Sequence, residues 1–280
     1  LEKPVYRDDY LRISMKDPDF NEAKRLANTL MDVYVINLDT HPERLERMAQ
    51  MLDQAGLEYT RIQAVNGREL YPTLQDLLDA HIINTNLDDP VVRYSQGFPN
   101  SWIRQIINRV DENGEVIDEK INQKNNLAGH VGCTMSHNKA LTAASKSNKP
   151  YAFILEDDAV FVYPEKEMAL DLLAVIEEHQ RRKVDADIIT LLQSPAGFSA
   201  SKLAPVHTAT GGTHAYLVPK ERVERILDAL SPPYVSYYDQ WWYWEELHGL
   251  KLVGYKKVLF PQDMTQSRGG RSSTGYDPVV

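Results

Sequence analysis

The sequence predicts an α/β fold in which a mostly parallel central sheet is flanked by helices. Residues 33–38 form a β-branched, apolar stretch typical of a strand, and a helical pattern and a second strand at 59–65 follow it. This strand–helix–strand order is the unit from which parallel sheets are built. Residues 151–155 are an unbroken apolar run, which suits a strand that helices cover on both faces.

The helix between the first two strands carries the clearest local signals. Thr40 and Glu43 have the spacing of a capping box, with Pro42 in the first turn. Apolar residues then recur at the i, i+3, i+4 and i+7 positions of one helix face, namely Leu45, Met48, Ala49 and Leu52. We therefore expect a helix from residue 42 to Gly56, which ends it.

Later elements follow from apolar periodicity and turn residues. We expect helices at 129–146, after Pro164 and after Pro219, and strands at 187–193, 214–218 and 252–260. A second apolar run, at 159–162, follows the run at 151–155.

The chain is expected to contain one domain, at residues 31–267, between an N-terminal extension at 1–30 and a tail at 268–280. Residues 81–127 interrupt the regular pattern because they are polar and poor in helical periodicity. Within them, residues 106–117 suggest a hairpin about Asn113-Gly114. Such an insertion is either a substrate-selecting loop, here on the acceptor side, or an inert elaboration.

Composition excludes several classes of protein. The 280 residues are 42% hydrophobic, enough for a sizeable core, and the formal charge of −9 argues against a nucleic-acid binder. The single cysteine, Cys133, excludes an internal disulfide and a cysteine metal cluster, as suits a reducing compartment. No apolar run approaches the roughly 20 residues of a membrane span, and the start lacks a signal-peptide pattern. We expect a cytoplasmic protein without a transmembrane segment.

Three consecutive carboxylates, Glu156, Asp157 and Asp158, follow the apolar run at 151–155. An unpaired charge is too costly to continue into a buried strand, so these side chains must lie where the strand leaves the sheet. Open α/β sheets bind ligands at this carboxyl edge. Mutual repulsion of the three charges would be relieved by Mn²⁺ or Mg²⁺. The alternative is a solvated acidic turn.

Two further stretches are candidate binding sites. The strand-to-helix junction carries Asn37, Asp39, Arg44 and Arg47, and a helix N-terminus with arginines nearby can bind an anion. Ordinary solvated helix residues are the alternative. The stretch 234–244 is dense in aromatic residues and contains Asp239, a combination that suits sugar recognition, although its tryptophans could simply pack inward.

Residues 127–137, LAGHVGCTMSH, followed by FILEDD at 153–158, resemble the core signature of glycosyltransferase family 25. That family includes bacterial lipooligosaccharide galactosyltransferases and procollagen galactosyltransferases. Other blocks fit the family in the same order: VINL at 35–38 with Arg44, AVNG at 64–67, residues 210–218, and Asp239. The ordered matches run from residue 33 to about 267. The insertion at 81–127 and both ends of the chain depart from the pattern.

The resemblance implies a nucleotide-sugar-dependent glycosyltransferase of the A-type fold, whose Rossmann-like half binds the donor, commonly UDP-galactose with Mn²⁺. Glu156, Asp157 and Asp158 would be the metal ligands. The resemblance also implies a set of donor-binding residues: Asn37, Leu38, Arg44, Ala64, Asn66, Gly67, Ser136, His137, Asp157 and Gly212. The acceptor would be a saccharide or glycoconjugate, as in lipopolysaccharide biosynthesis, with possible peripheral association at the inner face of a membrane.

Family members are understood to invert the anomeric centre, which requires a carboxylate to deprotonate the attacking hydroxyl. Asp239 is our candidate base and Glu156 the alternative. Tyr238, Trp241 and Trp242 are expected to bind the acceptor. Two other readings stay open: a metal-dependent nucleotide-sugar phosphohydrolase that uses the same acids with water, and a catalytically degenerate sugar-binding protein.

Overall fold

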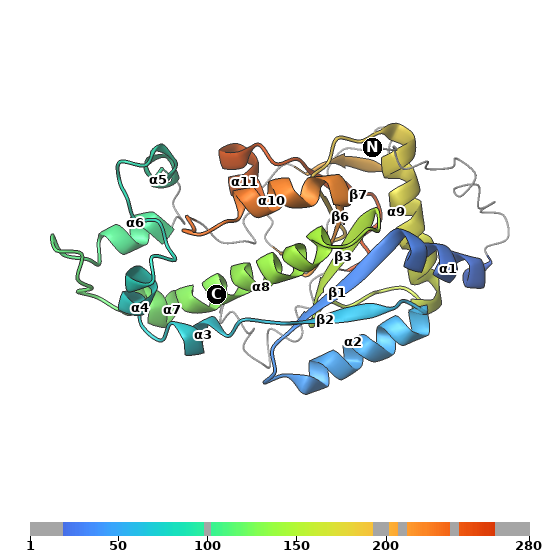
Figure 1. The fold of residues 1–280 in the computed structure, drawn as a ribbon, viewed down its shortest axis with the longest axis horizontal. Helices are drawn as coiled ribbons and strands as arrows, with labels where there is room; N and C mark the ends of the chain where they lie inside the picture. Colours follow the sequence, from blue (N-terminus) through green and yellow to red (C-terminus); the bar gives the residue numbers. More distant parts are fainter. Residues whose placement is uncertain (1–18, 98–101, 193–201, 207–211, 236–240, 261–280) are drawn as a thin grey trace.

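The computed structural model describes residues 19–97, 102–192, 202–206, 212–235 and 241–260. In this part of the chain a seven-stranded sheet has the order β2-β1-β3-β6-β4-β7-β5 (Figure 1). Its strands are β1 (Met31–Asn37), β2 (Tyr59–Gln63), β3 (Tyr151–Glu156), β4 (Ile188–Thr190), β5 (Leu203–Pro205), β6 (Ala215–Pro219) and β7 (Leu252–Tyr255). The expected α/β architecture is confirmed, and β5 is a strand that the sequence pattern does not predict.

The sheet is mixed, so the prediction of a mostly parallel sheet is wrong. β1 pairs in parallel with β2 and with β3, and β4 pairs in parallel with β7. β6 is antiparallel to both β3 and β4, and β5 is antiparallel to β7. The reason is that β6 inserts between β3 and β4, which run in the same direction on either side of it. Its first residues therefore lie at the edge where β3 and β4 end.

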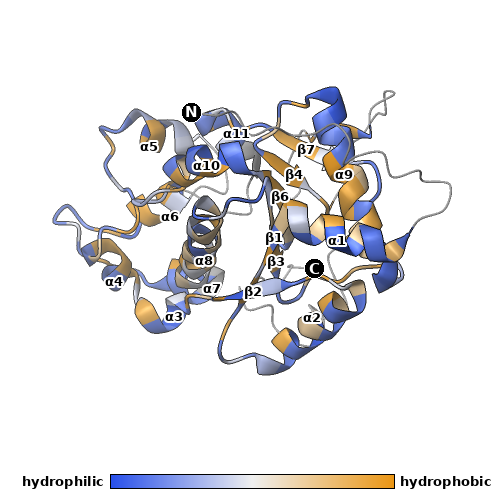
Figure 2. Ribbon diagram, turned by 45° about the vertical axis from the view of Figure 1, so that its right-hand side comes forward, coloured by the Kyte–Doolittle hydropathy of each residue, from blue (hydrophilic) through white to orange (hydrophobic). Residues whose placement is uncertain are grey.

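Helices cover both faces of the sheet. Helices α1 (Phe20–Leu30), α2 (Pro42–Ala55) and α9 (Met168–Arg182) share one hydrophobic cluster with Val33, Val35 and Phe153. Helices α8 (Leu127–Ser145) and α10 (Val223–Ala229) pack on the other face, with Tyr34 and Ile154. Successive strand residues thus point to opposite faces and are buried on both, as the apolar runs predict. Figure 2 shows the hydrophobic strands enclosed by helices whose outer faces are polar.

Helix α2 begins and ends where expected but is capped differently. Its N-cap is His41 with no side-chain hydrogen bond, so the predicted capping box of Thr40 and Glu43 is not formed. Pro42 in the first turn has no backbone N–H, so the helix start has one fewer donor that needs a capping partner. Gly56 ends the helix in the left-handed conformation, with φ +68°.

The described parts of residues 67–126 fold against the N-terminal half of α8, at one end of the molecule (Figure 1). Its short helices are α3 (Gly67–Leu70), α4 (Leu74–Asp79), α5 (Pro90–Ser95), α6 (Trp102–Ile107) and α7 (Lys120–Asn125). A separate hydrophobic cluster there contains Trp102, Ile103 and Val131. The hairpin expected at 106–117 forms only in part: residues 106 and 107 are helical, and one bridge pairs Val110 with Val116.

Other differences concern the ends of elements. α8 begins two residues before the predicted start, and β7 ends at Tyr255, well short of residue 260. The apolar run at 159–162 is not part of a named strand: Ala159 and Phe161 are buried, whereas Val160 and Val162 are exposed.

Short 3₁₀ helices, η2 (Glu165–Glu167) and η3 (Lys220–Arg222), precede α9 and α10, and α11 (Trp241–His248) precedes β7. None of the helices described is both long and apolar enough to span a bilayer.

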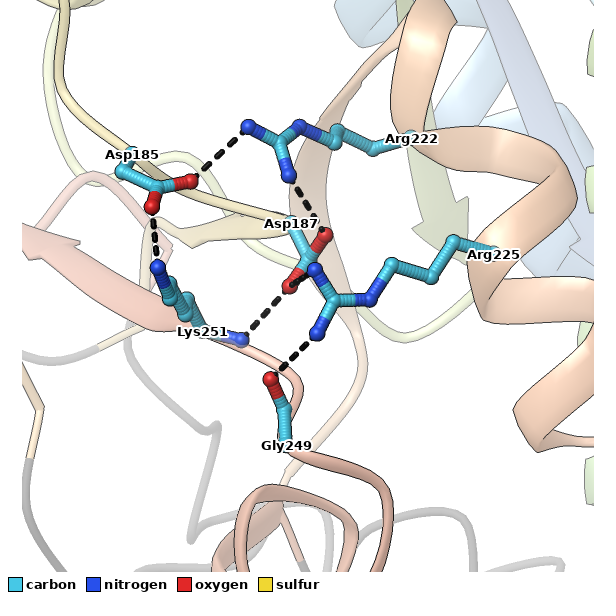
Figure 3. A network of polar contacts seen from close by, with 6 residues as sticks. All are labelled: Asp185, Asp187, Arg222, Arg225, Gly249 and Lys251. Carbon is cyan, nitrogen blue, oxygen red and sulfur yellow. Dashed lines mark hydrogen bonds and ion pairs between the residues drawn. The ribbon is translucent and has the colours of Figure 1, made fainter.

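A network of ion pairs ties together the elements at the amino end of β4 (Figure 3). Asp187 is fully buried and lies 3.4 Å from Arg222 Nη1 and 3.5 Å from Arg225 Nη1. It also accepts a hydrogen bond of 2.7 Å from the backbone N–H of Lys251. Asp185, which is half exposed, pairs with Arg222 and Lys251. The network joins β4, α10 and β7 at the sheet edge opposite the acidic triplet.

Candidate active site

The acidic triplet lies at the carboxyl edge of the sheet, as predicted. Glu156 is the last residue of β3 and is in register with Ile36 near the end of β1. Asn37 ends β1, and β2 runs parallel beside it, so the polar residues that follow these strands meet at one edge. The start of β6 arrives at the same edge because β6 is antiparallel. The ends of β1, β2 and β3 and the start of β6 therefore meet at the site, to which helices α2 and α8 also contribute side chains.

Asp157 is held by residues from the β1–α2 junction. Its Oδ2 accepts a hydrogen bond of 2.7 Å from Asn37 Nδ2, and its Oδ1 lies 3.4 Å from Arg44 Nη1. Asn37 is fixed in turn, because its Oδ1 accepts from Arg61 Nε at 3.1 Å and its Nδ2 also donates to the backbone carbonyl of His41. The side chains of Arg44 and Asp157 are only 15% and 11% exposed. The ion pair is therefore largely shielded from solvent.

Glu156 is held from the other side, by α8 and by the start of β6. His137 Nε2 lies 3.3 Å from Glu156 Oε1, and the hydroxyl of Thr213 donates to the same oxygen. The Nδ1 atom of the fully buried His137 lies 2.9 Å from the hydroxyl of Tyr216 on β6. Both ring nitrogens of His137 thus have partners, which fixes the orientation of the ring.

The three carboxyl groups differ in their proton affinity. Burial would raise the pKa of Glu156, but the hydrogen bond and charge of His137 and the hydrogen bond from Thr213 outweigh burial and lower it. For Asp157, burial raises the pKa and the contacts with Asn37 and Arg44 only partly offset it. Burial, together with the charges of Glu156 and Asp157, raises the pKa of Asp158 to about 7. The triplet thus holds more negative charge than Arg44 compensates.

The loop at 64–67 packs closely on α8 and forms one wall of the site. A Cβ atom on Gly67 would lie 1.8 Å from the carbonyl oxygen of Ala128, and one on Gly132 would lie 2.6 Å from the backbone of Val65. Ser136 fastens the contact because its Oγ accepts from the Val65 N–H at 2.8 Å and donates to the Gly132 carbonyl at 2.6 Å. Backbone contact this close requires glycine at both positions.

These elements line a cleft with a cavity volume of about 70 Å³. Most of the expected donor-binding residues line it, namely Leu38, Arg44, Ala64, Asn66, Gly67, Ser136, His137 and Asp157. Asn37 lies behind Asp157, and Gly212 precedes Thr213 near the start of β6. The predicted residues, scattered over 120 positions of sequence, are therefore brought together around one cavity. A second, more open cavity of about 360 Å³ adjoins it along Leu38 and residues 63–66.

The expected acceptor side is described only in part. Tyr238 and Asp239 lie outside the described residues. Trp241 and Trp242 lie in the first turn of α11, and only the backbone of these two residues is described. Trp244 on the same helix is buried, as the alternative of inward packing anticipates for at least one tryptophan.

Several residues of the site were not predicted. Thr213 and Tyr216 hold Glu156 and His137, Arg61 holds Asn37, and Cys133 and Arg68 line the cleft. The partners on β6 could not be identified because no local pattern reveals that an antiparallel strand lies beside β3.

The acidic triplet fits a hard divalent cation. Its donors are all oxygen atoms, which Mg²⁺ and Mn²⁺ prefer, and burial, followed by the charges of Glu156 and Asp157, raises the pKa of Asp158, so a bound cation would favour its charged form. Ligand atoms of the three acids do not all lie within 4.8 Å of one another; among the described residues that distance is met by Cys133, His137 and Glu156. Wider spacing is compatible with a cation that keeps several water ligands and contacts one or two carboxylates.

Fold and site together define an α/β protein with an acidic, arginine-flanked cleft at the carboxyl edge of its sheet. The family model for glycosyltransferase family 25, described as an LPS biosynthesis protein, matches residues 31–242, about three quarters of the chain. The chain belongs to glycosyltransferase family 25. It is 26% identical over 153 residues to a "Glycosyltransferase 25 family member" of Drosophila melanogaster, a match that covers 55% of this chain and 19% of the fly protein.

Proposed function

We propose that the protein is a metal-dependent glycosyltransferase that transfers a hexose, galactose from UDP-galactose, to a hydroxyl of a saccharide or glycoconjugate acceptor. The observation that carries the proposal is that Glu156 and Asp157 line one cleft beside Arg44, with Asp158 next in sequence, in a chain that belongs to this family. Nucleotide-sugar donors carry a diphosphate, and a cation held by carboxylates is the usual complement to it.

Asp158, with Asp157 and Glu156, would hold Mn²⁺ or Mg²⁺. When bound, the cation neutralises the charge that grows on the departing diphosphate. Arg44 would help to neutralise the charge on the diphosphate from the side of the β1–α2 junction, where its guanidinium lies against Asp157. Asn37 holds the Asp157 carboxylate in place, so that its orientation is set before the donor binds.

Inverting transfer needs a base for the acceptor hydroxyl. The lowered pKa of Glu156 makes it a weak proton acceptor, and its Oε1 is already engaged by His137 and Thr213. We therefore assign the base to Asp239, our candidate from the aromatic stretch, with Trp241, Trp242 and Tyr238 on the acceptor side. A lipid-linked acceptor would bring the protein to the inner face of a membrane from the cytoplasm.

A panel of nucleotide sugars, with and without Mn²⁺, tests the donor assignment by thermal denaturation. UDP-galactose at 100 to 1,000 times its dissociation constant should stabilise the protein by about 3 to 4 kcal/mol, and only with the cation. Asp158→Asn should abolish the Mn²⁺-dependent shift, whereas the same change at the exposed Asp53 on α2 should leave it intact. Equal shifts for every nucleotide sugar, or a shift indifferent to Mn²⁺, would refute the assignment.

Product analysis separates transfer from the alternatives. A transferase forms free UDP only in proportion to glycosylated acceptor. A phosphohydrolase cleaves the donor without an acceptor and yields UMP and a sugar phosphate. A binding protein gives the thermal shift but no product. Asp239→Asn should lower turnover by at least 100-fold with donor affinity retained. Unchanged turnover would remove Asp239 from the role of base.

A further inference from the structure

Three side chains of different chemistry meet in the wall of the cleft. The ligand atoms of Cys133, His137 and Glu156 all lie within 4.8 Å of one another. Cys133 and His137 are four residues apart on α8, which places them on the same helix face, and β3 brings Glu156 against that face. His137 is buried, Cys133 is partly exposed, and a quarter of the Glu156 side chain is exposed. The group is therefore reachable from the cleft.

The spacing suits a tetrahedral metal ion. A Zn²⁺ ion bonded to nitrogen and oxygen at about 2.0 to 2.2 Å holds these two atoms about 3.3 Å apart. His137 Nε2 and Glu156 Oε1 are already 3.3 Å apart. A thiolate bonded to the same ion would lie about 3.5 Å from either atom. Since the sulfur is within 4.8 Å of both, a movement of about 1 Å completes the geometry.

Neighbouring hydroxyls already orient two of the three ligands. Tyr216 contacts His137 Nδ1 at 2.9 Å, and Thr213 donates to Glu156 Oε1. Metal-binding histidines typically have such a partner on the second ring nitrogen, which fixes the ring and leaves the first nitrogen's lone pair for the metal. The Tyr216 hydroxyl can accept the Nδ1 proton of the neutral ring, so His137 can bind through Nε2 without losing this contact.

The mixed donor set distinguishes this group from the acidic triplet. A thiolate and an imidazole favour Zn²⁺ over Mn²⁺ or Mg²⁺, and three protein ligands leave a fourth position for water or substrate. All three residues line the cleft. Glu156 belongs to both groups. An ion held with Cys133 and His137 therefore occupies a carboxylate that the triplet also uses.

We propose that Cys133, His137 and Glu156 form a Zn²⁺ site, and that Zn²⁺ bound there inhibits the enzyme. Binding replaces the thiol proton of Cys133, which is released to solvent, by a bond from sulfur to zinc. Inhibition rests on the proposed function, because it follows from the withdrawal of Glu156 from the triplet and from the presence of an ion in the wall of the donor cleft. The binding site itself does not rest on it.

Alkylation of Cys133 tests the site directly, because the chain contains one cysteine. The rate of carboxamidomethylation, followed by mass spectrometry on the full chain, should fall at least tenfold with micromolar Zn²⁺ and should not fall with Mn²⁺ or Mg²⁺. Substituting Co²⁺ should produce the near-ultraviolet sulfur-to-metal charge-transfer absorption of a cobalt thiolate. Unchanged alkylation, or the absence of this absorption, would overturn the proposal.

Variants assign the remaining ligands. His137→Gln and the isosteric Glu156→Gln should each lose Zn²⁺ protection of Cys133. His130→Gln, the same change on the same helix outside the group, should keep it, and so should Asp158→Asn, which alters only the triplet. If His137→Gln does not fold, the loss of Zn²⁺ protection in Glu156→Gln still tests the site. Protection that persists in Glu156→Gln would refute the three-residue site.

Transfer assays with added Zn²⁺ then separate the two proposals. Inhibition of sugar transfer by Zn²⁺, at the concentrations that protect Cys133, supports the regulatory role. Protection of Cys133 in a protein that transfers no sugar would refute the proposed function but leave the metal site standing. Transfer that continues at full rate with Cys133 protected would refute inhibition.

Discussion

Asn37 and Asp157, which are 120 residues apart in the sequence, are joined by a hydrogen bond of 2.7 Å between the ends of neighbouring strands β1 and β3. Asn37 is 1% exposed and also contacts Arg61 and the His41 carbonyl. One amide side chain thus ties β1, β2, the start of α2 and the acidic triplet together.

Asn37→Ala should destabilise the protein by about 1 to 3 kcal/mol, because Asp157 and Arg61 both lose a buried partner. Chemical denaturation in urea measures the difference. Asn108→Ala, on an exposed helix end where the amide bonds only to the Arg104 carbonyl, is the matched control and should cost less than about 0.5 kcal/mol. Equal losses for the two variants would show that the Asn37 contacts contribute nothing to stability.

Asp187→Ala should reduce the free energy of unfolding by about 1 to 3 kcal/mol, since Arg222, Arg225 and the Lys251 N–H lose a buried acceptor. Asp185→Ala, two residues away with a side chain 52% exposed, should cost less than about 1 kcal/mol. The network lies at the sheet edge opposite the cleft, so donor binding should be retained in any Asp187 variant that folds. Loss of donor binding in a folded Asp187→Ala protein would contradict this separation.

Gly67→Ala should displace the loop at 64–67 from α8, because the new methyl group would lie 1.8 Å from the Ala128 carbonyl. We expect a loss of about 1 to 3 kcal/mol in urea denaturation and a weaker thermal shift with the donor. Gly97→Ala is the control, since its methyl group would lie 3.2 Å from the nearest backbone atom, the Tyr94 carbonyl oxygen. A Gly67→Ala protein with native stability and donor binding would show that the loop adjusts freely.

His130 predicts a dependence of stability on pH. Burial, followed by the charge of Arg68, lowers the pKa of His130 from 6.5 to about 4. Between these values the unfolded chain binds the proton more readily than the folded protein, so stability falls as the pH decreases from 6.5 towards 4 and is unaffected above 6.5. The loss should be about 1 to 3 kcal/mol.

Urea denaturation of the wild type and of His130→Gln at pH 7.5, 6.0 and 5.0 isolates this contribution, because the other titrating groups are common to both proteins. As the pH decreases from 6.5, the free energy of unfolding of the wild type should fall relative to that of His130→Gln. A difference that is constant from pH 7.5 to 5.0 would exclude His130 as a source of the dependence.

Local patterns predicted the first half of the sheet well. Residues 33–38 and 151–155 are apolar on both faces because helices cover both, and Gly56 marks the end of α2 directly. The acidic triplet could be placed at the strand end because charges cannot enter the core. These conclusions depend only on the residues concerned and their immediate neighbours.

Long-range pairing could not be predicted in this way. The alternation of helices and strands suggested parallel neighbours, whereas β6 inserts antiparallel between β3 and β4. Thr213 and Tyr216 consequently reach Glu156 and His137, a contact that no sequence spacing reveals. Residues 106 and 107, which were expected to begin the hairpin, instead end helix α6, because Trp102, Ile103 and Ile106 pack into a cluster with α8.

The position of β6 also governs when the site can form during synthesis. When β3 is synthesised it can pair at once with β1, which precedes it in the chain. Its other edge stays open until β6, some 60 residues later, emerges from the ribosome. Until then the nascent chain exposes an unpaired, apolar strand edge, which favours association with other chains. Glu156 lacks its Thr213 partner over the same interval, so His137 alone of these two partners can hold this carboxylate until β6 is in place.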